Sequence, residues 1–376
     1  MRATVLRDPA LVKMAGRFVW LEIDTEKEAN AGFLEKFPIE VWPTFLVIDP
    51  ATGKPVLKWL GTATAEDLSR LLADGERAVK GEAGESADAL LARGDRENAS
   101  GRTAEAVGLW EKALRAGGPR WPRRARTLES LVIGLQSAGE PRRCAEVALA
   151  EAPGMARGQS FANVVSLGLA CANDADAPWA KGIAAGLEPL AAEAVKLPGV
   201  LADDRAGLYD ALAAARTKAG DEKGARARTE EAWAFLVAER AGGKTPEART
   251  MLDSWIVGAA MDLHDPGRAV PLLKESEKAL PGDYNPPYRL AILYLELGRN
   301  DEALSANGRA LVLAYGPRKV RVLGQRATIL EAKGDAAGAR RALEEAIAYA
   351  GTLPKAQQNP RTVQRLEARL QKMKDG

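Results

Sequence analysis

The sequence predicts an α/β domain over residues 1–80, followed by an all-α domain over residues 81–376. Two observations predict this order. Runs of β-branched and aromatic residues, which are typical of strands, fall within the first 80 residues. The rest of the chain is rich in Ala, Leu, Glu and Arg, and Gly and Pro interrupt it at intervals of roughly 35 to 40 residues, which is typical of helical repeats. The stretch GEAGES at 81–86 is the expected linker.

The first predicted elements are a strand and a helix. The run FVWLEI at Phe18–Ile23 predicts a strand that ends at Asp24, and Glu26–Phe37 predicts a helix that Pro38 closes. The residues before them, MRATVLRDPALVKMAGRF, have the character of a helix fragment. They contain no apolar core of signal-peptide length.

A hairpin and a second helix complete this domain. Thr44–Ile48 reads as a buried strand, Gly53 provides a turn, and Pro55–Leu60 reads as the returning strand. Pro43 precedes the first of these strands, where a proline removes no hydrogen bond from within the ladder. The helix Thr64–Lys80 begins with a threonine cap and two acidic residues in its first turn.

The second domain repeats a pattern of small residues around glycines. Ala291, Ala303 and Ala310 stand at fixed offsets from Gly298, and alanines recur at the same offsets from Gly334. Gly101 and Gly220 show the pattern less completely, and Gly139 fits it less well. Small residues at these offsets let two antiparallel helices approach closely, and the glycine makes the turn between them.

This spacing resembles the tetratricopeptide repeat. The match is good over residues 286–350 and fair over 86–117 and 201–236. The distances between the glycines leave room for about seven helical hairpins, followed by a polar closing helix at Thr362–Lys374. The resemblance implies a curved solenoid whose concave groove binds a protein or peptide segment. It does not identify that partner.

The first domain resembles the C-terminal two-thirds of a thioredoxin-like domain. The resemblance rests on the order of elements, on Trp42-Pro43-Thr44 before an apolar strand, and on Gly61 after the last strand. In that family the proline is cis and lies beside the redox cysteines, where the backbone offers an edge to an extended substrate. The resemblance therefore implies that Trp42, Pro43 and Thr44 form a peptide-binding loop. Trp42 either stacks on a bound peptide or covers the end of the sheet.

The family's Cys-x-x-Cys motif is missing, because residues 1–80 contain no cysteine. The family's central strand, which precedes the first helix, is missing as well. Three explanations are open: the natural protein begins upstream of Met1, the remaining strands pair directly, or another chain supplies the strand. We favour the first, because MRATVLRDPA is a poor beginning and a good helix fragment.

Composition excludes several function classes. The chain has 53 Lys and Arg against 51 Asp and Glu, so we expect no nucleic-acid partner. No apolar run is long enough to span a membrane. His264 is the only histidine, and we expect it in an exposed loop rather than in a metal or catalytic site. The glycines follow helices rather than strands, so no phosphate loop is indicated.

The remaining candidates have structural interpretations. We expect Cys144 and Cys171 to be buried small residues rather than a disulfide. The basic run Arg120–Arg126 reads as a solvated helix start rather than an RNA or phosphate contact. Trp110 and Trp233 are expected in the packing between repeats.

Two functional hypotheses follow. The first is a protein- or peptide-binding scaffold in which the repeats carry a redox-inactive thioredoxin-like appendage, with no catalytic residue, cofactor or metal. The second is a thiol-disulfide oxidoreductase or chaperone whose Cys-x-x-Cys lies upstream of Met1. The chain as written is expected in the cytoplasm, and in the periplasm or outside the cell if the true N-terminus lies upstream. The oligomeric state is left open.

Overall fold

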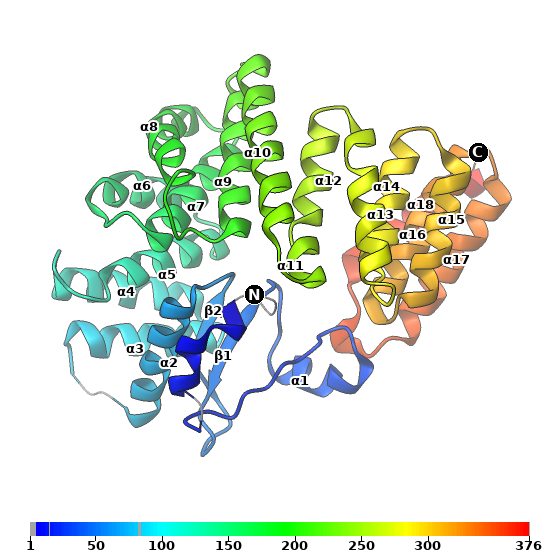
Figure 1. Cartoon of the computed structure of the whole chain (residues 1–376). Helices are drawn as coiled ribbons and strands as arrows, with labels where there is room; N and C mark the ends of the chain where they lie inside the picture. Colours follow the sequence, from blue (N-terminus) through cyan, green and yellow to red (C-terminus); the bar gives the residue numbers. More distant parts are fainter. Residues whose placement is uncertain (1–4, 15, 82–83, 376) are drawn as a thin grey trace. The chain divides into compact units, whose positions relative to one another are not determined.

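The computed structural model of the chain describes residues 5–14, 16–81 and 84–375 (Figure 1). They separate into two compact units. Unit 1 comprises Met1–Phe18 and Val41–Leu236, and unit 2 comprises Val19–Glu40 and Val237–Gly376. The boundaries of these units differ from those of the predicted domains, because residues 19–40 group with the C-terminal helices. The division at residue 80 stays a prediction.

The predicted hairpin is present in unit 1. Strands β1 (Thr44–Ile48) and β2 (Pro55–Leu60) pair antiparallel, with Phe45 opposite Trp59 and Val47 opposite Leu57. Helix α2 (Ala65–Lys80) follows, and the side chain of Thr64 accepts a hydrogen bond from the amide of Asp67, as the predicted cap requires. A Cβ atom on Gly75 of α2 would lie 2.8 Å from a methyl carbon of Val47, so the glycine lets the helix approach the strand.

The predicted strand at Phe18–Ile23 is wrong. In the described part of the chain the sheet contains only β1 and β2, and residues 18–23 have no regular structure. A strand needs a ladder of hydrogen bonds to a neighbouring strand, and among the described residues the sheet pairs β1 only with β2. The predicted helix at Glu26–Phe37 is shorter than expected, with a 3₁₀ turn at Glu28–Asn30 followed by α1 (Ala31–Lys36). The chain before it forms two 3₁₀ helices, Val5–Arg7 and Pro9–Met14.

Four helical hairpins begin in unit 1. They pair α3 (Ala87–Ala99) with α4 (Thr103–Gly117), α5 (Arg124–Ser137) with α6 (Pro141–Glu151), α7 (Gln159–Asp174) with α8 (Pro178–Ala194), and α9 (Ala202–Lys218) with α10 (Glu222–Gly242), which continues past the boundary of the unit. In several hairpins a glycine follows the first of the two helices. Gly101 after α3 and Gly220 after α9 have positive φ angles, as a helix-ending turn requires.

Trp110 shows how neighbouring hairpins pack. Its side chain is 2% exposed, as predicted for a core residue. A Cβ atom on Gly94 of α3 or Gly134 of α5 would lie 2.7 Å from its ring. The indole is therefore enclosed by two glycines from adjacent helices. Trp233, by contrast, is only half-buried.

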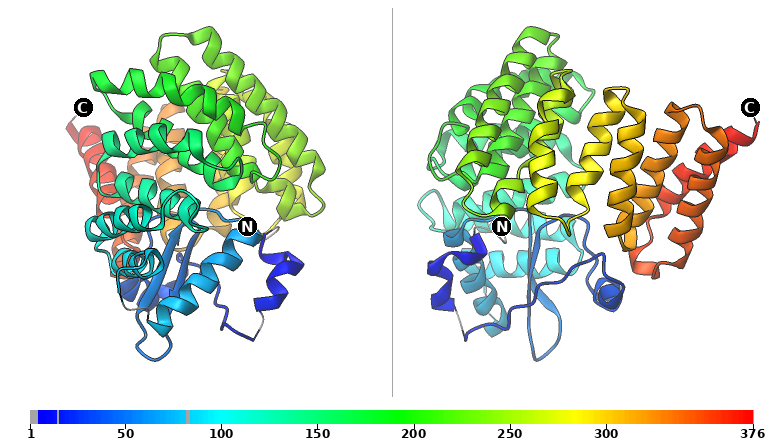
Figure 2. Two further views of the ribbon diagram at one scale, coloured as in Figure 1. Left: turned by 90° about the vertical axis from the view of Figure 1, so that its left-hand side faces the viewer. Right: turned by 45° about the vertical axis from the view of Figure 1, so that its right-hand side comes forward.

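Unit 2 continues the pattern after a short helix, α11 (Pro246–Thr250). Its hairpins pair α12 (Asp253–Asp262) with α13 (Val270–Ala279), α14 (Asn285–Glu296) with α15 (Asn300–Leu313), and α16 (Gly316–Ala332) with α17 (Ala336–Thr352). The right-hand view of Figure 2 shows these helices, yellow to orange, side by side. Helix α18 (Pro360–Asp375) packs on α17 and confirms the predicted closing helix. The described residues thus contain the seven expected hairpins.

The basic run is not a solvated helix start. Arg123 Nη1 donates to Asp88 at 2.9 Å, and Arg126 Nη2 donates to Asp95 at 2.8 Å. Arg124 donates to Glu151 at 2.6 Å. The expectation fails because α3 and α6 bring carboxylates to the start of α5. These carboxylates lie 27 to 35 residues away from the arginines in the sequence. The run is part of the packing of unit 1.

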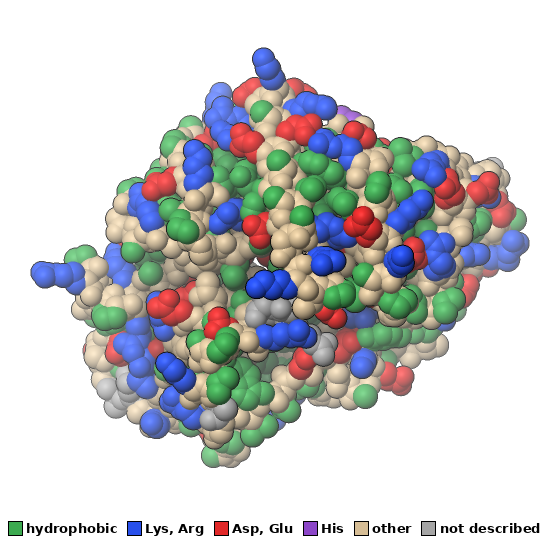
Figure 3. All heavy atoms as spheres, viewed as in Figure 1, with side chains coloured by type: hydrophobic (Ala, Val, Ile, Leu, Met, Phe, Trp, Pro, Cys, Tyr) green, Lys and Arg blue, Asp and Glu red, His purple; other side chains and the backbone are tan. Residues whose placement is uncertain are grey.

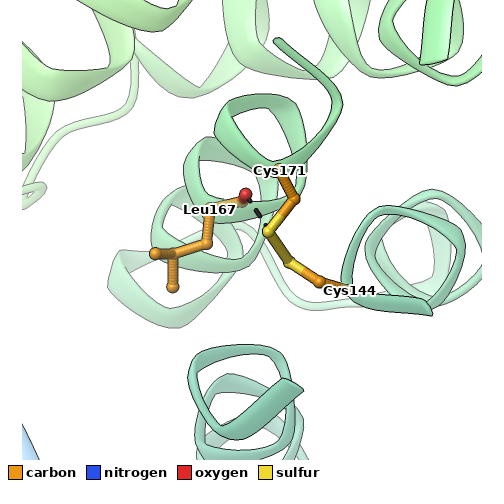
Figure 4. Close-up of a disulfide and its surroundings, with 3 residues drawn as sticks. All are labelled: Cys144, Leu167 and Cys171. Carbon is orange, nitrogen blue, oxygen red and sulfur yellow. Dashed lines mark hydrogen bonds between the residues drawn. A yellow bond between two sulfur atoms is a disulfide. The ribbon is translucent and has the colours of Figure 1, made fainter. Parts of the chain in front are cut away.

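The two cysteines form a disulfide, which corrects the prediction that they stay unpaired (Figure 4). Cys144 lies on α6 and Cys171 on α7, and both are buried. The spacing of 27 residues gave no sign of pairing, because contact between these positions depends on how α6 packs on α7. The bond links two successive hairpins.

Reduction of the disulfide is expected to destabilise unit 1. Closing a loop of this length contributes about 3.5 kcal/mol to the free energy of unfolding in the chain-entropy model. Equilibrium unfolding in denaturant, with and without a reductant, measures the difference. The variant Cys144→Ala/Cys171→Ala should show no response to the reductant. Two free thiols in the unfolded, unreduced protein would contradict the bond.

Candidate functional site

The loop predicted to bind peptide, Trp42-Pro43-Thr44, lies directly before β1. The Trp42–Pro43 peptide bond is cis. The Pro43 carbonyl accepts a hydrogen bond from the amide of Gly61 at 2.9 Å, and the Thr44 hydroxyl donates to the carbonyl of Val41 at 2.6 Å. Trp42 is 64% exposed. The loop therefore presents an aromatic side chain from a fixed backbone, and its binding role stays a prediction.

A polar cluster inside unit 1 joins the loop after β2 to three repeat helices. The Thr62 hydroxyl donates to Asp204 Oδ2 of α9 at 2.5 Å, and Gln159 Nε2 of α7 donates to the same oxygen at 2.7 Å. Asn163 of α7 donates to Glu129 Oε1 of α5 at 2.6 Å. The sequence gave no signal for this cluster, because its members are isolated polar residues on separate helices.

Burial raises the pKa of both carboxyl groups in this cluster. The pKa of Glu129 rises to about 7, because burial disfavours its charged form more than the hydrogen bonds from Asn163 and Ser160 favour it. The pKa of Asp204 rises to about 6, again because of burial, although Thr62 and Gln159 act in the opposite direction. The cluster therefore holds acids that are partly protonated near neutral pH.

Replacing Glu129 by Gln should change how stability depends on pH. Because the folded-state pKa of about 7 lies above the ordinary 4.5, the stability that Glu129 contributes is full below about pH 4.5 and is lost as the pH rises through about 7. Glu129→Gln should remove this loss and stabilise the protein at pH 8 by at most about 3 kcal/mol. Denaturant unfolding from pH 4 to 8 measures it.

The matched control is Glu344→Gln, at an exposed position of α17. It should leave the pH profile unchanged. The smaller loss of stability with rising pH that is due to Asp204 should remain in both variants, because the pKa of Asp204 is also raised. Identical profiles for Glu129→Gln and the unmodified chain would contradict a raised pKa at Glu129.

Unit 2 contains a second polar site, where its repeats hold the chain's own residues Asp24–Lys27. These residues form a turn, which we call the acidic turn: the amide of Lys27 donates to the carbonyl of Asp24 at 3.2 Å, and the amide of Glu26 donates to Asp24 Oδ1 at 3.0 Å. Nearly 300 residues separate the turn from the helices that hold it, so its position could not be read from the sequence.

Two arginines and a tyrosine bind the carboxylates of the acidic turn. Tyr315 donates its hydroxyl proton to Asp24, and Arg318 forms an ion pair with Glu26. Arg318 Nη2 also lies 3.6 Å from Asp24 Oδ1, and Arg321 Nη2 lies 3.1 Å from Glu26 Oε1. Each carboxylate is thereby in contact with side chains from the start of α16.

Aromatic rings hold Arg318 in position. Its guanidinium carbon lies 4.7 Å from the ring centre of Tyr315 and 5.2 Å from that of Tyr284. Its Nη1 atom donates to the Tyr315 hydroxyl at 2.7 Å. Burial and the hydrogen bond to Asp24 raise the pKa of Tyr315 to about 12, so the hydroxyl stays a donor over the physiological range. Burial lowers the pKa of Arg318.

The backbone of the acidic turn is recognised as well. Gln357, which is 6% exposed, donates from Nε2 to the carbonyls of Thr25 at 3.0 Å and Lys27 at 2.9 Å. A Cβ atom on Gly316 would lie 2.1 Å from the Glu26 carbonyl, so only glycine admits the turn this closely. Gln357 Oε1 is buried without a partner in the described part of the chain.

Other predicted candidates do not join these sites. His264 is exposed at the turn after α12, as expected. Among the described residues, no group of three or more His, Cys, Asp or Glu could hold a metal ion. No described helix is long and apolar enough to cross a membrane. Figure 3 shows positive and negative side chains interspersed on the face it presents.

Comparison with known families finds one match, within unit 2. Residues 260–311, which include α13 and α14, match the tetratricopeptide repeat model. The match covers one stretch of the helical hairpins and supports the expected repeat type there. No curated protein matches the sequence of the chain.

Several solved structures are similar to the chain. A tetratricopeptide repeat protein from Parabacteroides merdae is 11% identical, with 77% of this chain and 100% of that chain covered and a TM-score of 0.49. Yeast Tom70 is 15% identical, with 78% and 59% covered and a TM-score of 0.46, so the alignment spans less than two thirds of Tom70. The TPR2AB domain of yeast Sti1, solved as a pHSP90 complex, is 15% identical, with 77% and 98% covered and a TM-score of 0.31.

Proposed function

We propose that the protein is a peptide- or protein-binding scaffold, in which the repeats bind the partner and residues 1–80 form a redox-inactive, thioredoxin-like appendage. One observation carries the proposal. The repeats of unit 2 already hold a non-helical segment of the chain by its side chains and its backbone carbonyls, through Arg318, Tyr315 and Gln357. These are the interactions that a scaffold needs to bind a segment of another protein.

The appendage has its own proposed contact surface. Trp42, Pro43 and Thr44 present an exposed indole beside β1, which suits stacking on a bound segment. The buried disulfide favours an oxidising compartment, since disulfides persist there and are rare in the cytosol. We therefore propose the exported location, with the cytoplasm as the alternative.

A screen of short linear peptides tests the scaffold function. The full chain should select peptides that bind with micromolar dissociation constants. Their binding should slow hydrogen exchange in the repeat helices, because bound backbone and side chains are shielded from solvent. Scrambled peptides of the same composition should have dissociation constants at least about tenfold higher, which corresponds to a loss of about 1.4 kcal/mol of binding free energy. If no selected peptide binds better than its scrambled form, the scaffold function is wrong.

The second candidate is a thiol-disulfide oxidoreductase or chaperone whose Cys-x-x-Cys lies upstream of Met1. The order Trp42-Pro43-Thr44, β1, β2 and α2 favours it, because this order matches the C-terminal part of a thioredoxin-like domain. The chain's two cysteines are both buried in the disulfide, so neither offers an accessible thiolate.

The 376-residue chain should therefore show no disulfide reductase activity above that of Cys144→Ala/Cys171→Ala. A turbidity assay of insulin reduction compares the two proteins. Turnover by the unmodified chain that the variant lacks would show that the disulfide is catalytic, and the redox-inactive description of this chain would be wrong.

A further inference from the structure

The acidic turn occupies a site with the features of a ligand-binding site. The residues that hold it converge from the start of α16 and from the segment before α18 on a backbone turn with no regular secondary structure of its own. Structural packing alone does not require an arginine in contact with two tyrosine rings, or a buried glutamine that donates to two carbonyls.

The apolar residues on either side of the turn differ in how they are held. Val19 is 88% exposed and Leu21 is 73% exposed, although both belong to a run that is apolar enough to form a strand. Leu34 of α1 is buried, and α1 packs on residues 355–357 before α18. Polar contacts therefore fix the turn itself, while little apolar burial fixes the residues that lead into it.

The carboxylates determine what the site selects. Asp24 and Glu26 are two residues apart, and the turn directs both toward Arg318. Arg321 adds a second cation beside Glu26. Charge-assisted hydrogen bonds of this kind are about twice as strong as neutral ones. The Oε1 atom of Gln357 is buried and unpartnered in the described residues, so it can accept one further hydrogen bond from a ligand's N–H group.

We propose that the site formed by Tyr315, Gly316, Arg318, Arg321 and Gln357 binds an acidic turn of a partner protein, with an Asp-x-Glu sequence, and that the chain's own Asp24–Glu26 occupies it as an internal competitor. This inference rests on the proposed scaffold function. A partner binds only when the internal turn leaves, so the apparent dissociation constant equals the intrinsic one divided by the fraction of open sites.

Weakening the internal turn tests the proposal. The probe is a fluorescent peptide of residues 22–30, EIDTEKEAN, added to the full chain. The variant Asp24→Asn/Glu26→Gln keeps the size of both side chains but removes their charges. It should bind the probe about tenfold more tightly than the unmodified chain, because a larger fraction of its sites is open. A probe with the same two substitutions should bind about tenfold more weakly than the acidic probe.

Two further variants make the test specific. Glu28→Gln/Glu35→Gln removes the same charge at exposed positions of the same segment, so it should bind the probe like the unmodified chain. Adding Arg318→Ala to Asp24→Asn/Glu26→Gln should abolish the gain in affinity for the probe. Saturating probe should also speed hydrogen exchange of residues 19–40 in the unmodified chain, because the internal turn is displaced.

The outcomes separate this inference from the scaffold function. If Asp24→Asn/Glu26→Gln binds the probe no more tightly than the control variant, the inference is wrong. If the peptide screen selects ligands that Arg318→Ala does not weaken, the scaffold function stands and this site is not where it operates. If no peptide binds any of the variants, both proposals fail.

Discussion

Close packing of antiparallel helices through small residues is the constraint on which the rest of the structure depends. Each hairpin has an apolar face that it can bury only against its neighbours, so the helix spacing must stay short along the array. Gly94 and Gly134 show the requirement directly, because any larger side chain at either position would enter the ring of Trp110. Cys144 is another small, fully buried residue, and it bonds to Cys171 of the adjacent helix α7.

Polar residues add a second layer of organisation to this apolar framework. In unit 1, Arg123 and Arg126 connect the start of α5 to carboxylates of α3, and the cluster around Glu129 and Asp204 ties the loop after β2 to the repeat helices. The hairpin and α2 are therefore attached to the repeats by hydrogen bonds as well as by apolar packing. The two buried acids make that attachment sensitive to pH near neutrality.

Unit 2 uses its polar residues differently. Its repeats hold a turn from near the N-terminus, and the contacts to the carboxylates are made by side chains at the start of α16. An internal segment and a partner can compete for the same surface only if their chemistry is alike. The internal segment binds through the paired carboxylates of Asp24 and Glu26. A partner segment that replaces it would need a similar pair of carboxylates.

The sequence by itself determined the local elements of this protein. The apolar runs at Thr44–Ile48 and Pro55–Leu60, the threonine cap of α2 and the spacing of small residues around Gly298 and Gly334 act over a few residues. The β-hairpin, the helices and their pairing into helical hairpins could therefore be predicted. Only the tertiary structure decided the disulfide, the environment of Arg126, the irregular course of Phe18–Ile23 and the site of the acidic turn. Each of these depends on which distant residues become neighbours, because a strand needs a pairing partner and a charge needs a counter-charge. Neither partner can be identified from a pattern within one segment.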